Sequence, residues 1–459
     1  MLGNARVLGI EFRIEGGTTQ GAHIVTMPER FSILPLVVVA ALSGCAVGPD
    51  YRPTPVPAPT RWQAVVDTAL STLATTPSSD DVEALAHWWT WFEDDRLNTL
   101  IDIALAQNLD VRAASARVRG ERHAAQAGIG PQIGMGVGSQ RMQNPMPGIA
   151  PGLTFTLHEV GFDARWELDL FGRQKRRIEA ADAVVEASQA QVEAALTVLC
   201  AEVARSYWDL RAADTQLAIT RESIELADED ARRARRLMEA GIGTREAALT
   251  ASSRVGLAQA QLAAQELARG TAQRQIEHLL GVEPGKLAVS LHPRPQLLPQ
   301  FAPRLLLTPT AVLRNRPDIQ RAERQLAAVT ALKAAAVADM YPRVSLAMFF
   351  GLRNTALSAL MSIASKSWSG GGSVLQPLFD GGRLRAMVDV RDADVQAAVV
   401  EYERAMLDAL HETENALAQW LAAERSREAY SAILAARESA AALVSHRQAH
   451  GMAAAQDSD

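Results

Sequence analysis

The side chains that most often do chemistry in proteins are spread thinly along this chain. Its nine histidines form neither an HExxH motif nor a Cys/His ligand pattern. His446 and His450 are four residues apart, which suits a metal ion on a helix, but a solvated pair has the same spacing. The run Gly134, Gly136 and Gly138 is not followed by a helix start, which argues against a nucleotide loop. No nucleophile stands beside a base, so we expect no enzyme activity, no cofactor and no metal site.

Of the two cysteines, Cys45 has the more informative context. Residues 27–44 begin with charge, continue as an apolar run and end in small residues, which is the layout of a secretory signal. The end of this stretch, LSGC, resembles the lipobox of bacterial lipoproteins and implies cleavage before Cys45 and acylation of its thiol. An ordinary signal peptide with an incidental cysteine is the alternative. Because a signal normally opens a chain, we expect residues 1–26 to be a misannotated N-terminal extension.

Composition excludes one class of partner and favours one class of fold. The net charge of -6 and a pI near 5.9 argue against nucleic-acid binding. Hydrophobic residues make up 48% of the chain but aromatic residues only 5%, because alanine supplies much of the apolar content. Alanine favours long helices with closely packed axes. Within one such helix we expect Cys200 to be a small buried residue.

One strand pattern stands out in this mostly helical sequence. Residues 162–170 alternate between apolar and polar types, which predicts a strand with two different faces. The apolar positions are Phe162, Ala164, Trp166, Leu168 and Leu170. The charged positions are Asp163, Arg165, Glu167 and Asp169. The Gly- and Pro-rich segment QNPMPGIAPG just before them predicts a hairpin over residues 132–170.

Helical periodicity surrounds this hairpin. One helix is predicted over residues 98–126 and a second over residues 173–240, about 100 Å long at about 1.5 Å per residue. The second helix has a seam in steps of four and three, as in a coiled coil. The seam residues are Ala181, Val185, Ser188, Val192, Ala195, Leu199, Val203, Ser206, Leu210, Ala213, Leu217, Thr220, Ile224, Ala227, Ala231, Ala234 and Met238. Gly241 and Gly243 then end the helix, and Thr244 can cap a returning helix.

The second half of the chain repeats the first. NLDVRAASARV at 108–118 aligns with RPDIQRAERQL at 316–326, and DLF at 169–171 aligns with PLF at 377–379, both with a shift of 208. Beyond two extra residues in FDGGR the shift is 210, so that Gly241 aligns with Gly451. Each half is therefore predicted as helix, hairpin and long helix, followed in the first half by a return helix. The second half stops after Gly451, so we expect it to be truncated before its return helix.

Seven stretches together resemble the TolC-type outer membrane factors, in the NodT-like lipoprotein branch that works with RND pumps. They are LSGCAVGPDYRPTPVPAP, WWTWFEDDRLNTLIDIALAQNLDVRAA, RWELDLFGRQKRR, AEVARSYWDLRA, LRNRPDIQRAERQLAA, YPRVSLAMFFG and LFDGGRLRA. The resemblance implies a mainly α fold with a β-barrel part. Long coiled-coil helices would accompany four strands per protomer, and a homotrimer would close one 12-stranded outer-membrane barrel. It also implies a lipid-anchored protein that extends into the periplasm and meets a membrane-fusion adaptor and an inner-membrane RND pump.

The resemblance also assigns roles to residues. Phe162, Trp166 and Leu168 would face lipid, and Asp163, Arg165, Glu167 and Asp169 would face a wet lumen. The periplasmic tip that meets the adaptor would contain Gly241, Gly243, Thr244 and, in the second repeat, Gly451. A simple helix-stop role for these glycines is the alternative.

The expected organisation follows the repeat. After the extension at 1–26 and the signal at 27–44 come a lipid-anchored, proline-rich tether and equatorial segment at 45–97. The first repeat spans 98–280, a connector spans 281–305 and the second repeat spans 306–459.

The expected function is that of a passive exit duct for drugs and other small molecules. Two alternatives stay open: a non-conducting structural lipoprotein that spans the periplasm, or a truncated, non-functional member of the efflux family.

Overall fold

The computed structural model describes residues 46–52, 59–65, 74–75, 85–126, 130–144, 153–287, 289, 291 and 306–450. The chain divides into residues 1–44 and residues 45–459, and every described residue belongs to the second unit. Its α-helices are α3 (Asp95–Gln107), α4 (Leu109–Gln126), α5 (Arg173–Glu239), α6 (Arg245–Leu279), α7 (Pro309–Asn315), α8 (Pro317–Ala338) and α9 (Arg383–Ala449). Its strands are β1 (Ala74–Thr75), β2 (Gln132–Asn144), β3 (Leu153–Leu168), β4 (Leu306–Leu307), β5 (Arg343–Asn354) and β6 (Lys366–Leu375). The 3-10 helices among the described residues are η2 (Trp88–Phe92), η3 (Leu357–Ala359) and η4 (Ile363–Ser365).

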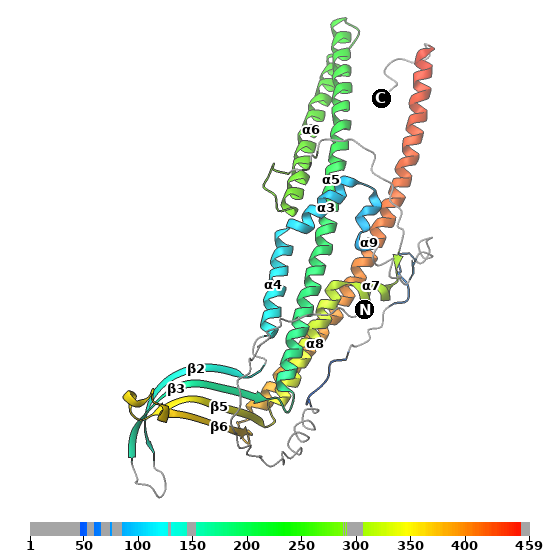
Figure 1. Ribbon diagram of the computed structural model, residues 1–459. Coiled ribbons are helices and arrows are strands. Elements are labelled where there is room, and N and C mark those ends of the chain that lie inside the picture. Colours follow the sequence, from blue (N-terminus) through cyan, green and yellow to red (C-terminus); the bar gives the residue numbers. More distant parts are fainter. Residues whose placement is uncertain are drawn as a thin grey trace, which may run out of the picture. The chain divides into compact units, whose positions relative to one another are not determined.

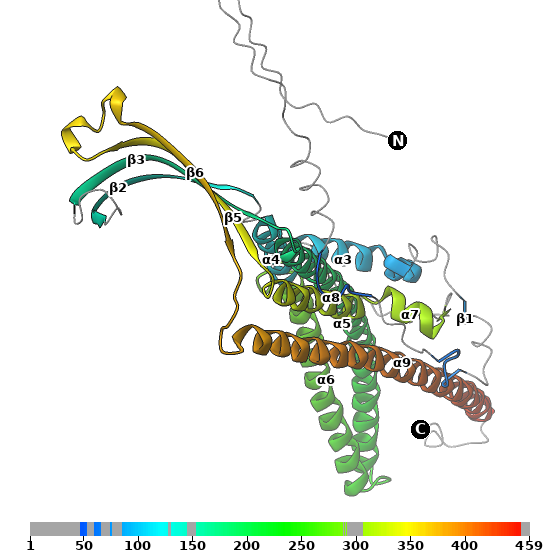
Figure 2. The same cartoon turned by 90° about the horizontal axis from the view of Figure 1, so that it is seen from below.

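Both halves of the chain follow the same order of elements, as the sequence repeat predicts (Figure 1). α4, the β2–β3 hairpin and α5 in the first half correspond to α8, the β5–β6 hairpin and α9 in the second. The two long helices α5 and α9 each contain 67 residues. α6 folds back along α5, and α8 packs against both α5 and α9 (Figure 2). Among the described helices, none combines the length and the apolar content needed to cross a membrane.

The larger sheet joins the two repeats. Its strands are all antiparallel and lie in the order β2-β3-β5-β6. Each hairpin supplies two neighbouring strands, and the pairing of β3 with β5 connects the hairpins. Phe162 lies opposite Met135 on one side and opposite Phe350 on the other. A separate parallel pair is formed by β1 and β4.

The buried face of α5 changes along the helix because its partners change. From Leu199 to Thr220 the predicted seam is confirmed, and every seam residue in this stretch is buried. Nearer the start of α5 the predicted seam is wrong, since the buried residues there are Ala180, Ala183, Ala187 and Ala190. Ala183 packs against Ala327 and Ala328 of α8, and small side chains let the two helices approach closely. Because α5 packs against different helices along its length, its buried residues do not follow one continuous coiled-coil seam.

The helix predicted over residues 98–126 is broken at Asn108. The Oδ1 atom of Asn108 accepts hydrogen bonds from the backbone N–H groups of Asp110 and Val111 at 2.9 and 3.0 Å, which caps α4. Its Nδ2 atom donates to the carbonyl oxygen of Leu279 at 2.9 Å. The same side chain therefore starts α4 and ties the break to the end of α6.

The main core lies where α3, α5 and α6 meet. Tyr207 is fully buried there, and its hydroxyl donates to Oδ2 of Asp94 at 2.7 Å. The other carboxylate oxygen of Asp94 caps α3 by accepting from the N–H groups of Arg96 and Leu97. Cys200 belongs to this core, as predicted, and burial raises the pKa of its thiol to about 11.

Residues 46–52 are docked onto the helices although they form no helix or strand. The N–H of Val47 donates to the carbonyl oxygen of Phe171 at 3.1 Å, and Asp50 forms an ion pair with Arg176 of α5. The hydroxyl of Tyr51 donates to Glu323 of α8 at 3.1 Å. Gly48 has φ +99°, and a Cβ there would lie 2.7 Å from Cα of Ala334. The start of the expected tether is thus held against α5 and α8.

Candidate functional site: a two-faced sheet and a helical tip

β3 carries the alternation that the sequence predicts. One face of this strand presents Phe162, Trp166 and Leu168, and the opposite face presents Asp163, Arg165 and Glu167. The side chains of Phe162 and Trp166 are 54% and 46% exposed, so this chain leaves large apolar groups open. Asp163, Arg165 and Glu167 are exposed as well. Both faces of the strand are therefore open in the single chain.

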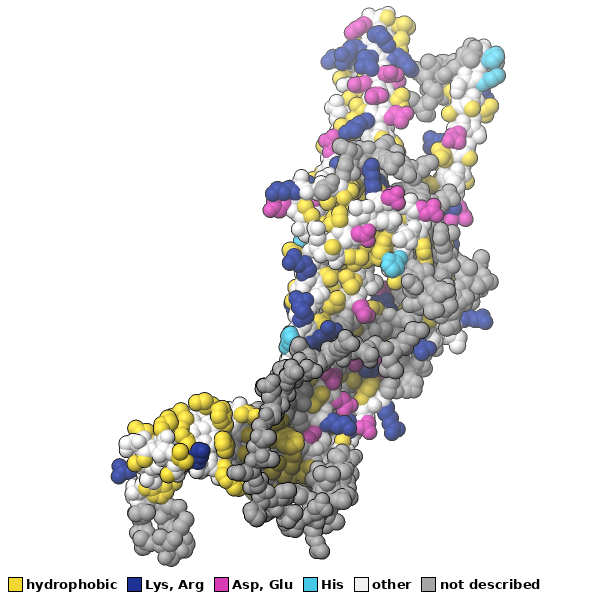
Figure 3. All heavy atoms as spheres, in the orientation of Figure 1, with side chains coloured by type: hydrophobic (Ala, Val, Ile, Leu, Met, Phe, Trp, Pro, Cys, Tyr) yellow, Lys and Arg dark blue, Asp and Glu magenta, His cyan; other side chains and the backbone are white. Residues whose placement is uncertain are grey.

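The three neighbouring strands extend the same division. Directly opposed residues in an antiparallel pair point to the same side, so the register assigns every strand residue to a face. We call the side of Phe162 the apolar face; hydrophobic side chains cover much of the visible sheet in Figure 3. Its exposed large hydrophobic residues are Ile133, Met135, Val137, Phe162, Trp166, Leu346, Met348, Phe350, Trp368 and Val374. Leu375, the last residue of β6, is an exposed exception on the other side.

The opposite side, which we call the charged face, collects the acidic residues. Glu159, Asp163 and Glu167 are the carboxylates of these four strands, and all three lie on it. Arg165 and Arg353 lie on the same face. Arg353 pairs with Glu159 across β3 and β5, with Nε to Oε2 at 3.0 Å. The sheet therefore separates acidic charge completely from its apolar side.

A row of glycines crosses the charged face, and the sequence pattern did not reveal it. Gly161 of β3 lies opposite both Gly136 and Gly351. A Cβ on Gly161 would lie 2.6 Å from the carbonyl oxygen of Phe350, so no side chain fits there. The ring of Phe349, which is 6% exposed, fills the space above the glycines, and the guanidinium of Arg353 lies 3.7 Å from its centroid. Register alone brings these residues together.

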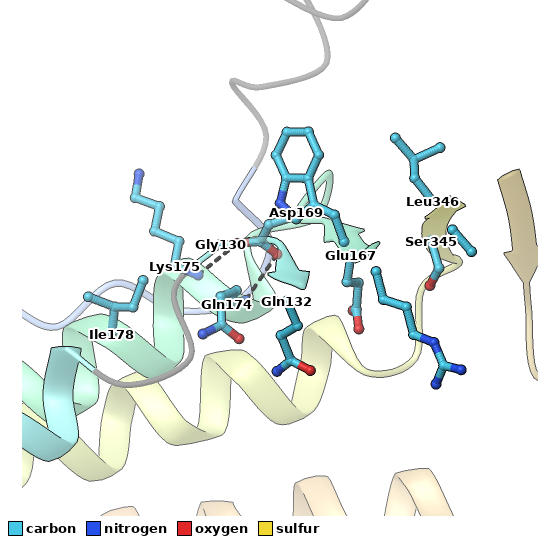
Figure 4. A pocket seen from close by; sticks show the side chains of 12 residues that line it. Gly130, Gln132, Glu167, Asp169, Gln174, Lys175, Ile178, Ser345 and Leu346 are labelled. Carbon is cyan, nitrogen blue, oxygen red and sulfur yellow. Dashed lines mark hydrogen bonds between the residues drawn. The ribbon is translucent and has the colours of Figure 1, made fainter. Parts of the chain in front are cut away.

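Asp169 does not belong to the strand, so that part of the prediction is wrong. β3 ends at Leu168, and the Asp169 carboxylate accepts from the N–H groups of Gln174 and Lys175 at 3.0 and 2.7 Å (Figure 4). These are first-turn groups of α5 that lack a partner within the helix. Asp169 therefore caps α5 at the junction of sheet and helices. A cavity of about 710 Å³ adjoins this junction and is lined by residues of β2, β3, β5 and α5 (Figure 4).

The tip between α5 and α6 has the tight geometry that its glycines predict. Gly241 has φ +73°, and the N–H groups of Ile242 and Gly243 both donate to the carbonyl oxygen of Leu237. Thr244 caps α6, because its Oγ1 accepts from the N–H of Ala247 at 3.1 Å. Ile242 is 78% exposed, so the turn presents an apolar side chain to its surroundings.

Two predicted sites, Cys45 and Gly451, lie outside the described residues. The rings of His446 and His450 stack with centroids 4.3 Å apart. His450 Nδ1 lies 2.8 Å from the carbonyl oxygen of His446. Across the described ranges, no group of three or more His, Cys, Asp or Glu side chains is arranged to hold a metal ion.

Comparison with known proteins assigns the family. The model of the family described as outer membrane efflux protein matches residues 100–282 and again residues 308–459. The chain belongs to the outer membrane efflux protein family. The two matched stretches correspond to the two halves of the repeat.

Curated relatives and a solved structure agree with this assignment. The chain is 31% identical over 444 residues to the outer membrane protein OprJ of Pseudomonas aeruginosa, covering 92% of this chain and 87% of OprJ. It is 30% identical to nodulation protein T of Rhizobium leguminosarum bv. viciae, covering 84% of this chain and 77% of that protein. The solved structure of the outer-membrane channel OprN superposes with a TM-score of 0.78 at 32% identity, covering 90% of this chain and 92% of OprN.

These matches confirm the predicted family and fold class of this outer membrane efflux protein. The NodT-like resemblance, the mainly helical fold with a four-stranded sheet, the channel function in efflux and the outer-membrane location are confirmed.

Proposed function

We propose that this outer membrane efflux protein is a homotrimeric, passive exit duct for drugs and other small molecules. It would join a periplasmic membrane-fusion adaptor and an inner-membrane RND pump, and carry out no catalytic step. The observation that carries this proposal is the division of the four-stranded sheet into an apolar and a charged face. A barrel wall needs lipid-compatible side chains outside and tolerates charge toward a wet lumen. Phe162, Trp166 and Leu168 then contact lipid, and Asp163, Arg165 and Glu167 line the lumen.

The extent of the apolar face supports this placement. On β3 it runs from Val160 to Leu168, which is about 26 Å at about 3.3 Å per residue. A strand tilt of about 40° reduces this to a height of about 20 Å. That height is comparable to the apolar band of about 25 Å on outer-membrane barrels.

The repeat supports assembly into a trimer. Ala180, Ala183, Ala187 and Ala190 of α5 are buried within the chain. Their second-repeat counterparts on α9, with the shift of 210, are Val390, Ala393, Ala397 and Val400, and all four are exposed. By analogy with the packing of α5 on α8, we infer that α9 packs on α4 of the next copy. The free edges of β6 and β2 would pair in the same way, and three copies would close 12 strands.

The two ends of the molecule have separate tasks in this proposal. Gly241, Gly243 and Thr244 form the periplasmic tip, where the exposed Ile242 and a compact backbone turn offer a contact surface to the adaptor. Gly451 occupies the corresponding position in the second repeat. Cys45 carries the lipid anchor in the outer membrane. Docking of residues 46–52 on α5 and α8 would hold that anchor close to the sheet.

Cysteine substitution at two adjacent residues tests the duct directly. We compare Asp163→Cys on the charged face with Phe162→Cys on the apolar face, after reconstitution in a planar bilayer. A negatively charged, water-soluble thiol reagent is expected to reduce single-channel current in Asp163→Cys and leave Phe162→Cys unchanged. Cys200 is silent in this test, since it is buried and its raised pKa of about 11 keeps it a thiol.

Two outcomes contradict the proposal. Assembled trimers of the unmodified protein that pass no current would favour the structural spacer. If the reagent reduces the current in Phe162→Cys but not in Asp163→Cys, the lumen lies on the apolar face and not on the charged face.

A further inference from the structure

The apolar face ends abruptly at the helix-distal ends of the strands. Val137, Val160 and Leu352 form its last aliphatic row. The next row consists of Ser139, His158 and Asn354. One further step along β2 is Arg141, opposite Thr156. The boundary therefore crosses three strands in register.

Beyond this boundary, hydrophobic residues of the β2–β3 hairpin lie on the side of the charged face and polar residues lie on the side of the apolar face. Phe155 and Leu157 lie on the side of the charged face, and Met142 lies opposite Phe155. Thr154, Thr156 and His158 lie on the side of the apolar face. On β2 and β3 these polar residues therefore mark the end of the apolar face.

Positive charge without acidic charge collects at this boundary. Arg141 of β2 and Lys366 of β6 are the cations on the apolar face, and Lys366 lies opposite Leu352 in the last aliphatic row. All three carboxylates of the four strands point to the other side. Arg141, His158 and Lys366, which we call the basic rim, therefore share their face with no strand carboxylate.

The connection between β5 and β6 positions one member of the basic rim. Asn354 donates from Nδ2 to Oγ of Ser365 at 2.8 Å and accepts from the N–H of Ala356 at 3.0 Å. Ser365 is 2% exposed and donates to the carbonyl oxygen of Ala359 at 2.8 Å. Lys366 follows directly and is exposed. An ordered turn thus holds its backbone beside the boundary.

We propose that the basic rim binds the phosphate groups of an anionic lipid where the apolar face meets the headgroup region. This inference rests on the proposed function, because it requires the apolar face to lie in the bilayer. Arginine and lysine donate charge-assisted hydrogen bonds to phosphate, and the histidine ring adds a further N–H donor. Neighbouring strands are about 4.8 Å apart and β5 lies between β3 and β6, so β2 and β6 are about 14 Å apart across the sheet. The long side chains of Arg141 and Lys366 therefore reach separate phosphate groups, with His158 between them. The acyl chains of the same lipid would cover the apolar face.

The test measures lipid A binding to the detergent-solubilised full-length protein by native mass spectrometry. Phosphatidylcholine serves as the lipid without net charge. The variants are Arg141→Gln, Lys366→Gln and their combination, with Arg165→Gln on the charged face as the matched control. Each rim substitution is expected to weaken lipid A binding roughly fivefold, and the pair about 25-fold. Arg165→Gln should bind like the unmodified protein, and phosphatidylcholine should bind all of them equally.

Several results overturn the proposal. One is equal lipid A affinity of the double variant and the unmodified protein, and another is a loss in Arg165→Gln as large as in the rim variants. Displacement of lipid A by excess inorganic phosphate would identify a site for free phosphate instead of lipid. Because binding is scored in detergent and conductance in a bilayer, a protein that binds lipid A but passes no current contradicts only the proposed duct.

Discussion

At the scale of single residues, the sheet depends on the absence of side chains at one point. Gly161 and Gly351 face each other across β3 and β5, and a Cβ on Gly351 would lie 2.3 Å from the carbonyl oxygen of Val160. The obstacle is backbone, which cannot rotate away as a side chain can. Phe349 packs over both glycines and supports Arg353 on the charged face.

Gly161→Ala is therefore expected to destabilise the sheet by about 1–3 kcal/mol through overpacking. The temperature at which the assembled protein loses its β-structure, followed by circular dichroism, should fall. Gly134→Ala is the matched control, since it lies on the same face and a Cβ there meets nothing within 4 Å. Equal melting temperatures for the two variants would refute the steric argument.

At the scale of elements, α6 is held to α5 by a buried cluster of charges. The side chain of Asp214 on α5 is 0% exposed, and its Oδ1 lies 2.7 Å from Nε of Arg269 on α6. Arg211 approaches the other carboxylate oxygen at 3.3 Å. Arg269 also donates from Nη2 to the carbonyl oxygen of Leu291 at 2.7 Å, which fixes the chain just beyond α6.

Asp214→Asn should loosen this pairing, because it removes the buried carboxylate charge that Arg211 and Arg269 share. The expected cost is about 3–5 kcal/mol. Hydrogen exchange should accelerate in residues 245–279. Asp209→Asn is the control, because Asp209 belongs to an exposed pair with Arg205 at 3.9 Å, and its loss should change little. If the amide protons of α6 in Asp214→Asn stay as protected from exchange as in the unmodified protein, apolar packing alone holds α6 on α5.

At the scale of the whole molecule, the two repeats differ in what they pack against. The first-repeat helix α5 has a partner within the chain, whereas the matching surface of the second-repeat helix α9 has none among the described residues. Within the chain, α5 meets α8 through alanines that are 3–7% exposed, whereas the matching row on α9 is exposed. Replacing Ala393 with arginine should place a charge in the contact between copies.

We expect Ala393→Arg to fold as a single chain and to fail to form the trimer, as measured by size-exclusion chromatography with light scattering. Glu401→Arg changes charge on the same helix, and its first-repeat counterpart Gln191 is exposed, so this control should assemble normally. A trimer of normal mass from Ala393→Arg would exclude the α9 row from the interface.

Patterns with a short period were readable along the chain. The two-residue alternation from Phe162 to Leu168 and the glycine break at Gly241 appear in the structure where the sequence places them. Such features depend on local geometry, in which the period of the backbone sets the direction of each side chain. Family membership also followed from the sequence, because its motifs are spread over nearly the whole chain.

The remaining features depend on which distant segments become neighbours. The glycine row, the separation of all carboxylates onto one face and the basic rim exist only once the register of β2, β3, β5 and β6 is set. The change of buried face along α5 likewise reflects its two partners, and Asp169 caps a helix because β3 ends one residue before it. The periodicity of a segment predicts which of its sides is apolar, whereas the tertiary structure determines which residues that side contacts.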